Sequence, residues 1–377
     1  MLGRHDIESK LMFLQLNKRR ERFLSILRCT LVQKGRYASA QNDRLVRAQL
    51  CKDMNKLGFL PIPKARLAVT LHFYASHPDA PQLPKLVKYL LDVLCTEVCR
   101  DDRQVEYLSC CCYRPSKAAR VSSRLKESVY VEVERLSDLL RLARVFRWLL
   151  GNHEFLDFAK DRTDRNRLTR GNCGEIEDLW PDAETAEFMN LPQATVRDLH
   201  SMIRRENQQK LLMINRLGAY DWPGARKNTL FEILRPLSDA NPFVFEMYEL
   251  PSTGGQKEYR SRLRTKLKEL NRTFPGFGRI LAPMELDIQV TPAGSTLTKD
   301  LDNIILQVSN AFTEELLENG SYLHGYRIYV TRNGGQSGMN HSILFRLLPA
   351  YEISDFERFF GETLKLGVEW LRDQTRQ

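Results

Sequence analysis

The strongest constraint on the fold of this chain is that one pattern of expected strands and helices occurs twice. Hydrophobic periodicity in the first half predicts these elements in order: a strand or short helix at 21–33, a helix at 41–57, a strand at 67–73, a helix at 85–98, strands at 105–113 and 128–134, and a helix near 137–150. The second half predicts a strand at 243–249, a helix at 256–272, a strand at 286–290, a helix at 301–317, strands at 325–331 and 342–348, and a helix at 353–372. The shared order indicates an internal duplication.

A repeat offset near 218 residues aligns the two halves without gaps around their central helices. It places Leu83 on Leu301, Asp92 on Asn310, Leu94 on Phe312, and Arg114 on Arg332. The alternative is that two unrelated α/β modules share a common element order. The sequence thus predicts an α/β (α+β) fold with two mixed-sheet domains separated by a helical insert. We expect a first domain at 1–135, the insert at 136–241, and a second domain at 242–377.

Composition narrows the class of protein. The 377 residues suggest two to three domains at ~150 residues each, and 42% hydrophobic content is enough to form buried cores. No apolar run is long enough to span a bilayer, and the first residues lack the features of a secretory signal. The net charge of +10 favours an anionic partner, of which nucleic acid is the commonest.

The eight cysteines do not follow any spacing typical of zinc modules. No CxxC pair occurs, and no cysteine pair is followed by suitably spaced histidines, so we expect no structural zinc site. Cys110–Cys112 lie in an expected strand, where free cysteine behaves as a small buried hydrophobic residue. Without a secretory signal the thiols should stay reduced, so we expect a cytoplasmic protein, associated with the nucleoid if it is bacterial.

The clearest chemical motif is Asp300-Leu-Asp302-Asn303, at the junction between a loop and an expected helix. Two carboxylates spaced in this way can converge on one divalent cation, and oxygen ligands suit Mg²⁺. A metal held there can polarise a phosphodiester and activate water. The simpler alternative is that Asp300 or Asp302 caps the helix, a position that favours acidic residues.

Several motifs together resemble the RusA family of Holliday-junction resolvases. The matching residues are Gly35-Arg-Tyr-Ala-Ser39, then Lys88, Asp92 and Leu94 on the expected helix, Arg100-Asp-Asp-Arg-Gln-Val105 after it, and Asp300-Leu-Asp-Asn303 in the second half. The resemblance covers about 21–135 and 242–350. It implies Mg²⁺-dependent DNA cleavage by acidic residues with a nearby lysine. Family members act as homodimers, so this chain would be a monomer acting as a pseudo-dimer.

Neither half carries the complete acidic set of the family. The first has Gln82 and Pro84 where Asp300 and Asp302 stand, and the second has Leu306 at the lysine position and Asn319-Gly320 at the paired-aspartate position. One explanation is decay of catalysis in both halves, leaving a DNA-binding scaffold.

The other explanation is complementary loss. If the two central helices lie antiparallel, Asp300 and Asp302 can join Asp101 or Asp102 and Lys88 in one composite site, with Asp300, Asp302 and Asp102 as metal ligands. The equivalent site on the other side of the pseudo-dimer, with Gln82, Pro84 and Gly320, would then be inactive.

Basic residues gather on corresponding segments of the two halves. Residues 1–60 hold thirteen lysines and arginines against five acidic residues, and residues 251–280 hold eight against two. Either these are solvated helix faces, or they contact phosphates. The candidates for phosphate contact are Arg36, Arg44, Arg47, Arg260, Arg262, Arg264, Lys266 and Lys268. The segment 191–200 has a weak helix-turn-helix pattern, although an ordinary packing helix explains it as well.

These observations favour a protein that binds branched or structured DNA with degenerate catalysis, as a binding or assembly subunit in recombination, mobile-element or phage-related DNA processing. The alternative is a Mg²⁺-dependent, structure-selective endonuclease with one composite site. The first function requires no metal, whereas the second requires Mg²⁺. Further protein partners in a larger complex are compatible with both, and a membrane is expected in neither.

Overall fold

The computed structural model of this protein describes most of the two halves. The described residues are 22–32, 38–59, 61–62, 65–77, 79–114, 127–150, 152–159, 161, 243–251, 256–273, 284–293, 297, 300–317, 322–331, 341–349 and 352–376. Most of the expected insert, including the segment 191–200, therefore lies outside the described residues, and so does Arg36.

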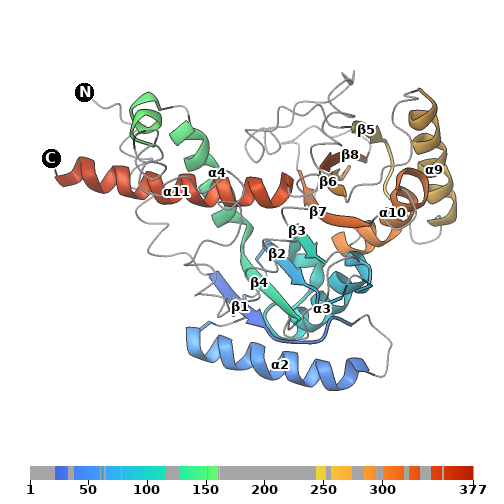
Figure 1. The fold of residues 1–377 in the computed structure, drawn as a ribbon, viewed down its shortest axis with the longest axis horizontal. Coiled ribbons are helices and arrows are strands. Elements are labelled where there is room, and N and C mark those ends of the chain that lie inside the picture. The colour runs from blue at the N-terminus through green and yellow to red at the C-terminus, as the bar shows by residue number, and fades with distance from the viewer. Residues whose placement is uncertain are drawn as a thin grey trace.

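The described chain is mixed α/β, and its element order follows the sequence prediction closely (Figure 1). The first half contains β1 (Arg22–Leu27), α2 (Ala38–Leu57), β2 (Leu67–Tyr74), α3 (Leu83–Glu97), the 3₁₀ turn η1 (Asp102–Gln104), β3 (Val105–Tyr113), β4 (Ser128–Arg135) and α4 (Leu136–Leu150). The second contains β5 (Phe243–Met247), α9 (Gln256–Thr273), β6 (Met284–Thr291), α10 (Leu301–Leu316), β7 (Leu323–Val330), β8 (Ser342–Pro349) and α11 (Glu352–Arg376). Within the ambiguous segment 21–33, residues Arg22–Leu27 form a strand.

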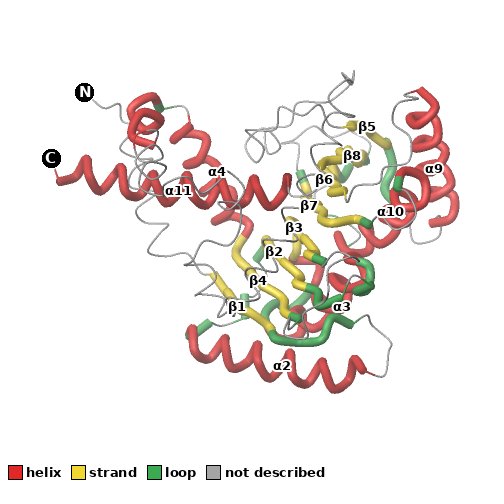
Figure 2. Tube along the Cα trace, in the orientation of Figure 1, coloured by secondary structure: helices red, strands yellow, loops and turns green. Residues whose placement is uncertain are grey.

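The strands of the described residues join one eight-stranded sheet in the order β1-β4-β2-β3-β7-β6-β8-β5 (Figure 2). In each half, a helix connects two parallel strands, β2 to β3 through α3 and β6 to β7 through α10. The remaining strands of each half pair antiparallel. Both parallel pairs even shift register at the same place, at their first residues. The two halves thus repeat one connectivity.

The halves meet where β3 pairs antiparallel with β7. At the centre of this pairing Ser109 faces Arg327, and these two residues hold equivalent positions at the 218-residue offset. The pairing therefore has the register of an approximate two-fold axis between the halves. Every residue of β3 and of β7 is buried, as expected for central strands covered on both faces.

Helices cover the two faces of the sheet differently (Figure 1). On one face α2 packs on α3, α3 on α10, and α10 on α9, and this layer encloses the main hydrophobic core. On the other face α4 and α11 pack on each other and on the sheet. Because α3 and α10 are neighbours, the end of one half's central helix lies beside the start of the other's.

Candidate functional site

Three carboxylates from the two halves come together between α3 and α10. Asp102 begins η1 just after α3, while Asp300 and Asp302 stand at the start of α10. One oxygen from each carboxylate lies within 4.8 Å of the others. The arrangement is therefore compatible with a single cation bound by both halves, because carboxylates sharing an ion must approach this closely.

At the start of α10, the two aspartates are both held by Asn303. Asp300 is the N-cap residue by position, but its side chain makes no capping hydrogen bond to the backbone. Instead, the side-chain amide of Asn303 donates to Asp300 Oδ2 at 2.9 Å, and the Asn303 backbone N–H donates to Asp302 Oδ1 at 2.7 Å. These two bonds do not involve Asp300 Oδ1 or Asp302 Oδ2. Helix capping therefore does not account for Asp300.

Lys88 on α3 supplies a positive charge to the cluster. Its Nζ lies 2.8 Å from Asp302 Oδ2 and 3.6 Å from Asp92 Oδ1. Burial by itself lowers the pKa of Lys88, but the hydrogen bond to Asp302 and the charges of Asp302, Asp92 and Asp102 together raise the pKa. The Asp302 side chain is only 1% exposed, so this ammonium stabilises a buried carboxylate.

The carboxylates nevertheless remain short of positive charge. Burial raises the pKa of Asp302 despite the ammonium of Lys88 at 2.8 Å. Burial, contact with Asp101 and the charges of Asp300 and Asp302 raise the pKa of Asp102 to about 6. Like charges held close together disfavour ionisation, and a divalent cation would relieve that repulsion.

The donor set fits a hard divalent cation. All three donors are carboxylate oxygens, the type that Mg²⁺ and Ca²⁺ prefer. Asp300 Oδ1 is buried and has no hydrogen-bond partner among the described residues, since the nearest charged nitrogen, Arg103 Nε, is 3.7 Å away. Around an octahedral Mg²⁺, adjacent ligands lie about 3.0 Å apart and opposite ligands about 4.2 Å apart, so binding an ion would draw these oxygens together from the observed limit of 4.8 Å.

Asp101 has a different role from its neighbour Asp102. Its side chain accepts a hydrogen bond from the backbone N–H of Arg103 at 3.0 Å, and the backbone N–H of Asp101 donates to the side chain of Gln104. This capping box closes η1, and the hydrogen bond from Arg103 lowers the pKa of Asp101. Of the two candidate aspartates, the structure thus places Asp102 in the cluster and Asp101 in a supporting turn.

Three further residues belong to the surroundings of the cluster but were not among the predicted site residues. Asn303 orients Asp300, Asp92 pairs with Lys88, and Arg103 carries a 73% exposed guanidinium beside Asp300. Asn303 and Asp92 lie within the motifs already identified, so the motif spacing could have included them. Arg103 could be assigned only once the two halves were placed together.

The equivalent corner of the other half has no acidic residues at the matching positions. Gln82 and Pro84 begin α3 where Asp300 and Asp302 begin α10, and Gln82 makes no side-chain capping bond. Gly320 lies outside the described residues. Among the residues that the structure describes, the carboxylate cluster is therefore on one side of the approximate two-fold axis.

The predicted phosphate-binding residues mostly form ion pairs within the chain. Arg47 pairs with Glu97 on α3. On α9, the pairs are Arg262 with Glu249, Arg264 with Glu314, Lys266 with Glu269, and Lys268 with Glu315. Arg44 is exposed and Arg260 half-buried. Surface ion pairs contribute little stability, so these cations can exchange a carboxylate for a phosphate.

Comparison with known proteins does not assign a family. No family model, no curated protein and no solved structure matches the chain. Within the described part of the chain, no helix is both long and apolar enough to cross a membrane.

Proposed function

We propose that this protein binds structured DNA and cleaves one phosphodiester bond at a single Mg²⁺ site built from both of its halves. The observation that carries this proposal is the convergence of Asp102 with Asp300 and Asp302, whose oxygens lie within 4.8 Å of one another. The resemblance to RusA-like resolvases supports DNA as the substrate, because its motifs contribute these same acidic residues.

Each residue of the cluster has a defined part in this function. Asp102, Asp300 and Asp302 would hold the ion, and Asn303 keeps Asp300 in position. A Mg²⁺ ion bound there would supply charge stabilisation at a phosphodiester and a more acidic water molecule. The ammonium of Lys88 adjoins the same carboxylates, where it can offset negative charge on a bound phosphate.

The one-sided arrangement has a consequence for the product. Among the described residues, only the corner at the start of α10 gathers three oxygen donors, since Gln82 and Pro84 occupy the equivalent positions of α3. A symmetric resolvase makes two cuts because it has two active corners. We therefore expect one nick in each branched DNA molecule bound.

A second candidate function is a non-catalytic DNA-binding or assembly subunit. The observation that favours it is the ion pair between Lys88 and Asp302, because an ammonium at 2.8 Å already partly neutralises the most buried acid of the cluster. In that case the acids would stabilise the contact between α3 and α10, and DNA would bind in the absence of a divalent ion.

Cleavage of defined DNA structures separates the two functions. The protein is incubated with four-way junction, fork and linear DNA in EDTA, Mg²⁺ or Mn²⁺, and the products are resolved on denaturing gels. We expect metal-dependent single nicks in branched DNA, lost in the Asp102→Asn variant and in the Asp300→Asn/Asp302→Asn double variant. Binding is measured in parallel by gel shift in EDTA.

The matched control is Gln82→Ala, which alters the residue equivalent to Asp300 and is expected to leave nicking unchanged. Junction binding without nicking in any of these metals would refute the nuclease and leave the scaffold function. Equal nicking by the wild type and both aspartate variants would show that a contaminant or another site cuts the DNA.

A further inference from the structure

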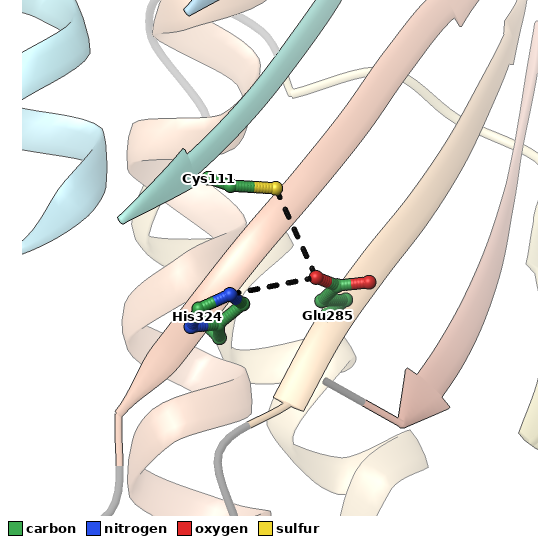
Figure 3. A group of neighbouring side chains, drawn as sticks. All are labelled: Cys111, Glu285 and His324. Carbon is green, nitrogen blue, oxygen red and sulfur yellow. Dashed lines mark hydrogen bonds and ion pairs between the residues drawn. The ribbon is translucent and has the colours of Figure 1, made fainter. Parts of the chain in front are cut away.

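A second group of metal-binding side chains lies on the opposite face of the sheet, where the two halves join. Cys111 is on β3 of the first half, whereas Glu285 is on β6 and His324 on β7 of the second half. Figure 3 shows the three side chains directed toward one another. Neither the acidic cluster between α3 and α10 nor the proposed nuclease function involves these residues.

The backbone register explains how the three residues meet. Gly325 on β7 pairs with Cys111 on one side and with Glu285 on the other. A Cβ atom at Gly325 would lie 2.9 Å from Cys111 Sγ and 3.0 Å from Glu285 Oε1. The thiol and the carboxylate therefore occupy the space that a side chain at position 325 would fill, and His324 lies next to them.

The spacing of the donor atoms is that of ligands around a small cation. Cys111 Sγ is 3.8 Å from Glu285 Oε1, and His324 Nε2 is 3.9 Å from the same oxygen. The nitrogen–oxygen distance is too long for a good hydrogen bond. Tetrahedral zinc, with bonds of about 2.0–2.3 Å, places its ligands about 3.3–3.6 Å apart. All three donor atoms lie within 4.8 Å of one another, so a modest contraction would complete the geometry.

Burial and charge define the kind of ion that fits. All three residues are 0% exposed or nearly so. A thiolate and a carboxylate supply two negative charges and a neutral imidazole supplies none, so a divalent ion would make the buried group neutral. The set of one sulfur, one nitrogen and one oxygen suits zinc better than Mg²⁺ or Ca²⁺.

The surrounding structure holds the ligands in place. Glu285 Oε2 accepts a hydrogen bond from the backbone N–H of Ile353 at 2.8 Å, near the start of α11. This bond fixes the carboxylate and turns Oε1 toward Cys111 and His324. The ring of Tyr113 packs edge-on against His324, with ring centroids 5.2 Å apart.

We propose that Cys111, Glu285 and His324 bind one zinc ion that joins the two halves of the sheet across the β3–β7 pairing. A water molecule would take the fourth position of the tetrahedral ion. The equivalent residues on the other side of the approximate two-fold axis are Tyr329, Ala68 and Glu106, which do not repeat the ligand set. This site would therefore occur once, on one side of the axis.

The sequence prediction of no structural zinc site rested on the spacing rules of zinc modules. Those rules describe ligands close together in the chain, whereas 174 residues separate Cys111 from Glu285. Only the pairing of β3 with β7 brings these ligands to one place, so spacing along the chain could not reveal them.

Metal analysis of the full-length protein tests the proposal. The protein is produced in zinc-supplemented medium, dialysed, and its metal content measured by mass spectrometry. To remove any zinc held by the acidic cluster, all samples carry Asp300→Asn and Asp302→Asn. We expect one zinc per chain in this background, and loss of zinc in Cys111→Ala. The matched control Cys112→Ala removes a neighbouring buried thiol that faces the helical core around α3, and it should keep the ion.

Substitution with Co²⁺ keeps the test decisive if Cys111→Ala does not fold. Cobalt in the proposed site would show a thiolate-to-metal charge-transfer band in the Asp300→Asn/Asp302→Asn protein. Circular dichroism confirms that the samples are folded. Folded protein without zinc, zinc retained in folded Cys111→Ala, or cobalt bound without a thiolate band would each overturn the proposal. None of these results depends on whether the acidic cluster cuts DNA.

Discussion

Replacing Lys88 with methionine removes the ammonium that partly neutralises the carboxylates between α3 and α10. Methionine keeps most of the apolar stem, so the change is mainly one of charge. Asp302, with a side chain only 1% exposed, would lose its partner at 2.8 Å. Its negative charge would then stand beside those of Asp102 and Asp300 without the ammonium of Lys88.

The structure sets the size of the expected effect. Removing one partner of a buried ion pair costs about 3–5 kcal/mol, because the remaining charge stays buried. Lys88 itself is 23% exposed, so we expect the lower end, about 3 kcal/mol of unfolding free energy at neutral pH. If the acids bind Mg²⁺, the ion at one hundred times its dissociation constant raises the unfolding free energy by about 2.7 kcal/mol. Magnesium should therefore nearly restore the stability of Lys88→Met.

The wild type should gain less from Mg²⁺ than this variant does, because the ammonium of Lys88 competes with the ion for Asp302. Urea unfolding followed by circular dichroism, with and without Mg²⁺, measures both free energies. Lys85→Met, which removes an exposed lysine from the same helix, is the control and should change little. A Lys88→Met variant as stable as the wild type would refute the electrostatic reasoning. A variant that is destabilised but gains nothing from Mg²⁺ would show that the acids do not bind the ion.

Three further predictions follow from other groups. The pKa of Asp102 is raised from 3.8 to about 6 in the folded protein. The metal-free protein should therefore lose stability as pH rises from about 4 to 6. Thermal melts across this range should show a weaker pH dependence for Asp102→Asn. Asp287→Asn breaks the buried ion pair with Arg327 Nε at 2.7 Å, and should lower the unfolding free energy by about 3–5 kcal/mol in urea titrations; an effect below 1 kcal/mol would show the pair to be solvated. Gly325→Ala would place a Cβ 2.9 Å from the backbone oxygen of Cys110, and should lower the unfolding free energy by about 1–3 kcal/mol in the same assay. An unchanged unfolding midpoint would show that the strands can separate there.

Local pattern was sufficient to predict the elements of the two halves. Alternating residues such as Leu67, Val69 and Leu71 identify β2, and the apolar face of α3 identifies that helix. The repeat itself follows from the same signals, because equivalent elements occur in the same order. The pairing of β3 with β7 could not be predicted in this way, since it depends on how two buried strands meet and has no local signature.

The candidate site was likewise only partly predictable from the sequence. The motif Asp300-Leu-Asp302-Asn303 and the Asp101-Asp102 pair could be found by spacing, and complementary loss of acids allowed a shared site. Which of Asp101 and Asp102 enters the cluster could not be read from the sequence, because it depends on the turn at η1. The ion pairs of the α9 residues with Glu314 and Glu315 could not be predicted from the sequence either, since they form between helices.

The pairing of Ser109 with Arg327 at the centre of the sheet limits what each half could do alone. In a dimer of identical chains, a residue on the two-fold axis meets its own copy. Two copies of the second half would therefore bring Arg327 against Arg327, two buried guanidinium groups with like charge, each already paired with its own Asp287. The joined chain avoids this repulsion because a serine stands opposite the arginine. A separated second half should accordingly fail to assemble the eight-stranded sheet with itself, although it carries every strand that such a dimer would need.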